Sequence, residues 1–104
     1  MGEVIKTRGW ALFPPGQVFV TPNLTATLES CGVDAHQEIV SAIERHLHGD
    51  WGTVCEEDWQ TNNAALRDGD RLLSAYETVK GHVSFWVITE WDRSVTTVLL
   101  PEDY

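Results

Sequence analysis

The spacing of apolar residues changes once along this 104-residue chain, at the segment RDGDR, residues 67–71. Before it, apolar residues recur every three or four positions, as they do on one face of a helix. After it, the segments RLLSAYETV, HVSFWVITE and SVTTVLL alternate and are rich in β-branched and aromatic residues. Because each spacing of apolar residues is typical of one kind of element, the first part of the chain is predicted to be helical and the last part to form a sheet.

Two helices are predicted in the first half, after a short strand over residues 17–20. Thr21 and Pro22 suit the cap and first position of the first helix, and Gly32 suits its end. Asp34 is predicted to cap the second helix, over AHQEIVSAIERHLHG. This helix carries the clearest amphipathic stripe in the chain, formed by Ala35, Ile39, Ile43 and Leu47.

The stretch HGDWGTVCEEDWQ, residues 48–60, is predicted to turn the chain into a third helix. Its GDWG segment has two glycines that allow a tight turn, and Asp50 is expected to cap the helix start that follows. The third helix is predicted to begin at Thr53 or Cys55. Its first turn holds three carboxylates, which stabilise a helix dipole by about 0.3–1 kcal/mol each: Glu56, Glu57 and Asp58.

The last third of the chain is predicted to form three antiparallel strands joined by two tight turns, VKGH and EWDRS. In the middle strand, one face carries Val83, Phe85, Val87 and Thr89, and the other carries Ser84, Trp86, Ile88 and Glu90. Both faces are partly apolar, so one is expected to pack on the helices and the other to be available to a partner. The tail PEDY is expected to be exposed.

The predicted fold is therefore α+β, with two or three helices packed on a three-stranded antiparallel β-meander and a short N-terminal strand. A chain of this length forms one domain, residues 1–104. No apolar run approaches the roughly 20 residues that span a bilayer. The start MGEVIKTRGW has no signal-peptide core, so a cytoplasmic location without membrane contact is expected.

The net charge of −9 is concentrated in residues 50–104, which carry eleven acids and four bases. This distribution disfavours direct nucleic-acid binding and favours a partner with a basic surface, either a host protein or a nucleoprotein complex. The alternative is that the charge only keeps the chain soluble. Seven acids are the candidate partner-binding residues: Glu56, Glu57, Asp58, Asp68, Asp70, Glu90 and Asp92.

A catalytic interpretation has less support, because the chain contains no GxSxG, P-loop or GxGxxG motif. No catalytic residue and no cofactor are assigned. The alternative to a binding protein is a small enzyme or ligand-binding domain that uses His48 with Asp50 and the Asp92-Arg93-Ser94 turn.

No metal site is expected either. Cys31 and Cys55 are predicted to be free thiols, since no compact set of ligands accompanies them. His46 and His48 lie two residues apart, a spacing that points their side chains away from each other on a helix.

The tryptophan content is high for a small core: Trp10, Trp51, Trp59, Trp86 and Trp91. Some of them are expected to be partly exposed, and exposed tryptophan is a favoured anchor at protein interfaces. Acidic side chains next to exposed aromatic rings favour a protein-binding surface.

Four segments carry a resemblance to a known group of proteins: FPPGQVFVTP, ERHLHGDWGTVCEEDWQTNNAAL, GDRLLSAY and FWVITEWDRSVTTVLLPEDY. They resemble a small family of bacterial plasmid and integrative-element proteins with the motifs RHxxGDWG, RLLSAY and ITEADRSxTTxLLPEEY. The resemblance covers about Phe13 to Tyr104. This chain has Trp91 where the family usually has Ala, and Asp103 where it has Glu.

Members of this family are often labelled plasmid-related proteins, and some are labelled type I restriction M subunits. A methyltransferase needs a doubly wound α/β domain with a cofactor loop, which this pattern of elements does not supply. The resemblance implies a mobile-element protein and no catalytic residues. Together with the charge, it favours an acidic, non-enzymatic inhibitor of a host defence complex, an anti-CRISPR or anti-restriction protein that acts as a DNA mimic.

Overall fold

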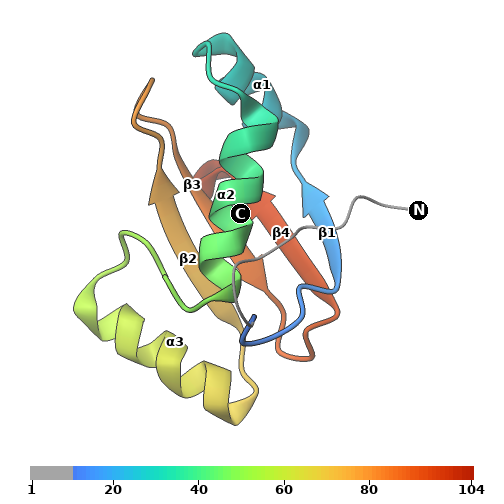
Figure 1. The fold of residues 1–104 in the computed structure, drawn as a ribbon, viewed down its shortest axis with the longest axis vertical. Helices are drawn as coiled ribbons and strands as arrows, with labels where there is room; N and C mark the ends of the chain where they lie inside the picture. The colour runs from blue at the N-terminus through green and yellow to red at the C-terminus, as the bar shows by residue number, and fades with distance from the viewer. Residues whose placement is uncertain (1–10) are drawn as a thin grey trace.

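Three helices and a four-stranded mixed sheet make up the computed structural model, which describes residues 11–104 (Figure 1). The predicted α+β fold is confirmed. The elements are β1 (Gln17–Val20), α1 (Pro22–Ser30), α2 (Ala35–Leu47), α3 (Glu56–Asp68), β2 (Leu72–Glu77), β3 (Ser84–Thr89), β4 (Val95–Leu99) and a short 3-10 turn, η1 (Pro101–Asp103).

The sheet has the strand order β1-β4-β3-β2. Strands β2, β3 and β4 form the predicted antiparallel meander. The N-terminal strand β1 pairs in parallel with β4, with Gln17 opposite Val95 and Val20 opposite Val98. The sheet therefore has four strands where the sequence predicted three, because β1 completes it from the far end of the chain.

The predicted ends of the first two helices are confirmed. The Thr21 hydroxyl accepts a hydrogen bond from the Leu24 amide at 3.3 Å, and an Asp34 carboxylate oxygen accepts one from the Gln37 amide at 3.2 Å. Gly32 follows α1 with a φ of 74°, the left-handed conformation that lets a helix end. Helix α2 then lies over the middle of the sheet (Figure 1).

The core lies between α2 and the sheet. One of the two predicted faces of the middle strand is buried along its whole length: Val83, just before β3, and Phe85, Val87 and Thr89 within it. Beneath α2, the buried ring of Trp51 stacks on Phe13, with the ring centroids 6.4 Å apart. None of the helices within residues 11–104 has the length and apolar composition needed to cross a bilayer.

The C-terminal tail is largely exposed, as expected, with Glu102 exposed and Tyr104 69% exposed, but it also contacts the opposite face of the sheet. The Tyr104 ring packs edge-on against Trp86 at 5.9 Å, and Ile88 and Leu99 on the same face are buried. Asp103 accepts hydrogen bonds from Thr21 and Asn23, which fixes the tail to the start of α1: Thr21 Oγ1 lies at 2.7 Å and Asn23 Nδ2 at 2.9 Å.

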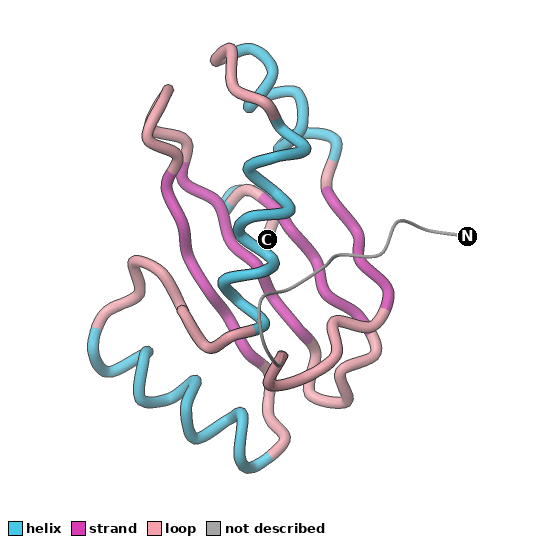
Figure 2. Tube along the Cα trace, viewed as in Figure 1, coloured by secondary structure: helices cyan, strands magenta, loops and turns pink. Residues whose placement is uncertain are grey.

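The loop between α2 and α3 runs along the outer edge of β2 (Figure 2). The Ala75 amide donates to the Trp51 carbonyl at 3.1 Å, and the Thr53 amide donates to the Ala75 carbonyl at 2.7 Å. A Cβ atom on Gly52 would lie 1.8 Å from the Ala75 carbonyl oxygen, so only glycine fits between these two bonds.

Candidate functional site

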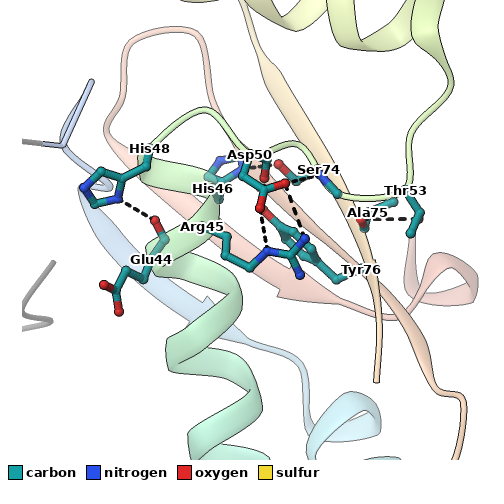
Figure 3. Close-up of polar contacts among 10 residues, drawn as sticks. Glu44, Arg45, His46, His48, Asp50, Thr53, Ser74, Ala75 and Tyr76 are labelled. Carbon is teal, nitrogen blue, oxygen red and sulfur yellow. Dashed lines mark hydrogen bonds and ion pairs between the residues drawn. The ribbon is translucent and has the colours of Figure 1, made fainter. Parts of the chain in front are cut away.

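The GDWG turn is held by an ion pair between the end of α2 and the turn itself (Figure 3). Arg45 donates to both carboxylate oxygens of Asp50, from Nε at 2.7 Å and from Nη2 at 3.3 Å. The Gly52 amide donates to the same carboxylate at 3.1 Å. The hydrogen bond from Arg45 is the main cause that holds the pKa of Asp50 below its usual value.

Asp50 caps an amide that follows it in the turn, as expected, but the prediction that it caps the third helix is wrong. Helix α3 begins at Glu56, its cap residue is Cys55, and no side chain accepts the first amides there. Asp50 instead closes its own turn by accepting the Gly52 amide two residues ahead. The reason is geometric. Residues 51–53 run along β2 before the helix starts, so Asp50 lies too far from the first amides of α3 to accept a hydrogen bond from them.

The His48 ring lies at the end of α2 and has a different partner from Asp50 (Figure 3). Its Nδ1 contacts the Glu44 carbonyl oxygen at 2.8 Å. A carbonyl only accepts, so Nδ1 carries the proton and Nε2 is an acceptor in the neutral ring. Nε2 is buried and has no hydrogen-bond partner in the described chain. His48 and Asp50 are therefore not arranged as an acid–base pair.

A surface cleft of about 480 Å³ follows this side of α2. Its lining is polar apart from one valine and includes both residues of the alternative site: Gln37, Val40, Ser41, Glu44, Arg45, His48 and Asp50. The cleft could accept a small polar ligand, with Arg45 as the cation. The Nε2 atom of His48 would become an acceptor for that ligand once the ring turned toward the cleft.

A second histidine, His46, is completely buried two residues away. Its Nδ1 lies 2.6 Å from the Ser74 hydroxyl and its Nε2 lies 2.9 Å from the Thr89 hydroxyl. Thr89 in turn contacts Thr96 at 2.7 Å, and Thr96 donates to the Pro15 carbonyl at 2.7 Å. One polar chain therefore crosses the core from β2 through α2, β3 and β4 to the loop before β1.

The donor and acceptor of each hydrogen bond in this series follow from the Pro15 carbonyl at its end, which can only accept. The Pro15 carbonyl takes the Thr96 proton, so Thr89 donates to Thr96 and His46 Nε2 donates to Thr89. His46 Nδ1 is then the acceptor for Ser74, and the ring is neutral. Burial is the main cause that lowers the pKa of His46 to about 3, and the nearby Arg93 charge lowers it further. His46 is a structural core residue, which the sequence analysis missed.

The seven candidate acids lie at the two ends of α3. The helix-start cluster consists of the exposed Glu56, Glu57 and Asp58. The turn cluster consists of Asp68 and Asp70 at the other end of α3 and Glu90 and Asp92 at the β3–β4 turn. A helix rises 1.5 Å per residue, so Glu56 and Asp68 lie about 18 Å apart along α3.

Arg93 brings the two halves of the turn cluster together. Its guanidinium donates to the carbonyls of Asp70 at 2.6 Å, Glu90 at 3.1 Å and Ala65 at 3.2 Å. The end of α3 is thereby fastened to the β3–β4 turn by a cation that satisfies helix-end carbonyls. The turn cluster is partly neutralised by Arg93, whereas the first turn of α3 contains only acidic charges.

The Asp92-Arg93-Ser94 turn is satisfied internally. Asp92 accepts from the Ser94 amide at 3.1 Å and from its hydroxyl at 2.6 Å, and the hydroxyl contact is the main cause that lowers the pKa of Asp92. The Arg93 guanidinium is engaged by three carbonyls. Three hydrogen bonds to carbonyls therefore already hold the guanidinium in place, which weakens the alternative in which this turn binds an anion.

The tryptophans divide as the sequence predicted. Trp51 is buried, Trp59 and Trp86 are half-buried, and Trp91 is 66% exposed. Trp10 lies outside the described residues. Trp91 lies between Glu90 and Asp92 in the sequence, so the β3–β4 turn carries an exposed aromatic ring next to two of the acids.

The two cysteines are free thiols, with Cys31 half-buried and Cys55 exposed. In residues 11–104, no group of three or more histidine, cysteine or acidic side chains is arranged to hold a metal ion.

Comparison with known proteins gives no assignment. The chain matches no protein-family model, and neither a curated protein nor a solved structure is significantly similar to it.

Proposed function

We propose that this protein is an acidic, non-enzymatic binding protein of a mobile genetic element. Its proposed action is to occupy a basic nucleic-acid-binding surface of a host defence complex, either a CRISPR surveillance complex or a restriction enzyme. The observation that carries the proposal is the placement of the seven candidate acids at both ends of one exposed helix, with Trp91 exposed at one of those ends.

The net charge and the spacing of the acidic clusters support a binding surface that matches only a short length of DNA. Duplex DNA carries one charge per about 1.7 Å, so a net charge of −9 corresponds to about 15 Å of duplex. The two acidic clusters lie about 18 Å apart along α3. The protein would therefore cover one basic patch of the target, with Trp91 as an apolar anchor beside the turn cluster.

The cleft along α2 favours a second candidate, a small polar-ligand site. The specific observation is the buried Nε2 of His48, which has no hydrogen-bond partner in the part of the chain that the structure describes. A ligand with an anionic group for Arg45 would bind in this cleft and, once the His48 ring turned toward it, would donate the missing hydrogen bond to Nε2. The substitution His48→Gln separates the two candidates, because it leaves both acidic clusters intact.

The test of the binding proposal is competition with DNA for a purified type I restriction enzyme and, separately, a CRISPR surveillance complex. Wild-type protein is expected to displace labelled target duplex from at least one of them. The triple variant Glu56→Lys, Glu57→Lys, Asp58→Lys is expected to compete much less well, above all by slower association. Raising the salt concentration should weaken wild-type competition, because exposed charges are screened over about 8 Å at physiological ionic strength.

A control variant changes the charge equally at exposed acids away from α3: Glu29→Lys, Glu77→Lys and Glu102→Lys. This control should compete nearly as well as wild type if the α3 surface makes the contact. Equal loss in both triple variants would mean that only net charge matters. Full competition with DNA by the α3 variant at low salt would reject the acidic surface. Loss of that competition in His48→Gln would favour the cleft instead.

A further inference from the structure

Strand β1 is the edge of the sheet, and one side of its backbone faces outward (Figure 1). The amide of Gln17 donates to the Ser94 carbonyl at 2.9 Å, and the amide of Thr21 donates to the Val98 carbonyl at 3.0 Å. In a parallel ladder, alternate residues face the same neighbour. The N–H and C=O groups of Val18 and Val20 therefore point away from β4, along the open edge.

This edge lacks the charged side chains that usually prevent sheets from pairing. Natural edge strands are protected by charged side chains, especially lysine. Residues 9–28 contain no charged residue, the longest such run in a chain of net charge −9. The edge is apolar as well: Val18 is 37% exposed and Phe19 is 53% exposed.

A hollow of about 310 Å³ lies beside the edge on the helix side of the sheet. Val20, Ala35 and Ile39 form its apolar part, and Thr25, Glu29 and His36 complete the lining. A side chain that lies directly across the edge from Val20, on the same face of the sheet, would enter this hollow.

We propose that a second copy of this chain pairs with β1 across a two-fold axis, which joins two sheets into one of eight strands. The antiparallel register places Phe19 opposite Phe19 of the other copy, and Val18 opposite Val20. The outward N–H and C=O groups of Val18 and Val20 then form four hydrogen bonds between the copies. Val18 of each copy lies at the hollow beside Val20 of the other, and the two Phe19 rings meet on the opposite face.

The charge distribution is what selects a second copy as the occupant. A basic partner would gain little from a strand without charges, whereas two copies of β1 place no charged strand residues opposite each other. The pairing is also self-complementary, because the two-fold axis gives each outward residue its equivalent partner.

The proposed dimer has a small contact area and cannot add further copies. Pro15 and Pro22 flank β1 and limit the edge to four residues, so the contact area falls below that of a standard stable interface. On the other edge of the sheet, the β2 backbone is already bonded at Ala75 by residues 51–53 and at Leu73 by the Asn62 side chain. Pairing therefore stops at two copies.

This inference does not depend on the proposed function, and salt distinguishes the two. Binding of a basic partner to α3 weakens as salt rises. Dimerisation through the uncharged edge strengthens as salt rises, because salt screens the repulsion between two chains of net charge −9.

Sedimentation velocity over a wide concentration range, at low and high salt, measures the dimerisation of the full chain. The expected result is a rise from monomer to dimer with concentration, at lower concentrations when salt is high. Phe19→Lys places two ammonium groups next to each other across the axis and should weaken dimerisation about tenfold or more. Ser84→Lys is the matched control, since it adds the same charge at an exposed site on β3, two strands away.

A cysteine cross-link tests the register and does not depend on a loss of association. In a chain whose Cys31 and Cys55 are replaced by serine, Phe19→Cys should form a disulfide-linked dimer on mild oxidation. Directly opposed side chains of such a pair have Cβ atoms about 4.5–5.5 Å apart, close to the disulfide range. Gln17→Cys is the control, because the register separates the two introduced thiols by about 13 Å along the strands.

Rapid cross-linking at position 19 but not at position 17, together with dimerisation that salt promotes and Phe19→Lys weakens, would establish the pairing. A wild-type chain that stays monomeric at all concentrations and salts would overturn it. Equal cross-linking at both positions would overturn the register, and a dimer unaffected by Phe19→Lys would place the contact elsewhere.

Discussion

Helices α2 and α3 have the same length, 13 residues, but they are attached to the protein in different ways. Helix α2 buries Ala42, Ile43, His46 and Leu47 in the core. Helix α3 buries only Asn62 and Ala65, and Trp59 and Leu66 are half-buried. One helix is therefore held mainly by the burial of apolar surface, and the other presents most of its surface to solvent.

Polar contacts make up much of what holds α3. The Asn62 amide group pairs with the backbone of Leu73, with Nδ2 2.7 Å from the Leu73 carbonyl and Oδ1 3.2 Å from its amide. Asn63 accepts a hydrogen bond from the Trp51 indole at 2.9 Å, and Arg93 fastens the Ala65 carbonyl. These contacts hold α3 along β2 while leaving its acidic turns exposed.

The difference separates stability from the proposed binding surface. Substitutions on the buried side of α2 should act on the whole fold, whereas substitutions on the outer side of α3 should leave the fold intact and change its charge. The following predictions test this separation, beginning with the largest expected effect.

Ile43→Ala should be the most destabilising of these substitutions. Ile43 is 1% exposed, and truncation of a buried isoleucine to alanine costs about 2–5 kcal/mol of unfolding free energy. Leu66→Ala on α3 should cost clearly less, because its side chain is only half-buried. Urea denaturation of both variants measures the difference. Equal costs would show that α3 is as firmly built into the core as α2.

The His46 pKa predicts a fall in stability between neutral and mildly acidic pH. Below pH 6.5 the unfolded chain takes up a proton at His46, whereas the folded chain takes it up only near pH 3. The unfolded state then binds more protons, so the free energy of unfolding falls by about 1.4 kcal/mol per pH unit as pH falls through this window. Urea denaturation at pH 7, 6 and 5 should show a loss of about 2 kcal/mol at pH 5.

The substitution His46→Gln is the control for this pH effect. Glutamine offers a donor and an acceptor at this position but does not titrate, so the variant should start less stable at pH 7 and lose less stability down to pH 5. A wild-type slope that persists unchanged in the variant would show that other groups cause it.

The sequence predicted α2 well because the repeat of Ile39, Ile43 and Leu47 matches the helical period and Asp34 marks its start. It missed His46, although this residue falls three positions after Ile43 on the same face. Polarity argued against burial, and the hydroxyls that satisfy the ring come from Ser74 and Thr89, distant in sequence. A local pattern cannot show such partners.

The candidate acids were found from local charge density, but their arrangement needed the fold. Nothing in the spacing of Asp70 and Glu90 shows that Arg93 joins them. The parallel pairing of β1 with β4 is similarly non-local, since it connects strands separated by most of the chain. Asp50 illustrates the same limit. Residues 51–53 pair with Ala75, which is distant in sequence, and this pairing separates Asp50 from the start of α3.

Asn62→Ala should loosen α3 selectively. The substitution removes both hydrogen bonds to the Leu73 backbone, at an expected cost of about 1–2 kcal/mol. Hydrogen exchange should speed up in α3 more than in α2 if α3 can open by itself. Gln60→Ala is the control, because Gln60 is exposed on the same helix and its side chain donates to Glu56 within that helix. Equal acceleration in both helices would show that they unfold as one unit.

Asp50→Ala should have the smallest effect, about 0.5–1 kcal/mol, because the ion pair with Arg45 is close to half-exposed and therefore screened. The pKa of Asp50 is lowered, so its contribution is present above pH 3.8 and is lost as pH falls through the folded-state pKa. Asp50→Asn keeps an acceptor for the Gly52 amide and should recover part of the loss. Since Cys55 and not Asp50 precedes α3, neither variant should speed hydrogen exchange in the first turn of that helix. Faster exchange there would mean that the joint between the two helices supports α3 as well as α2.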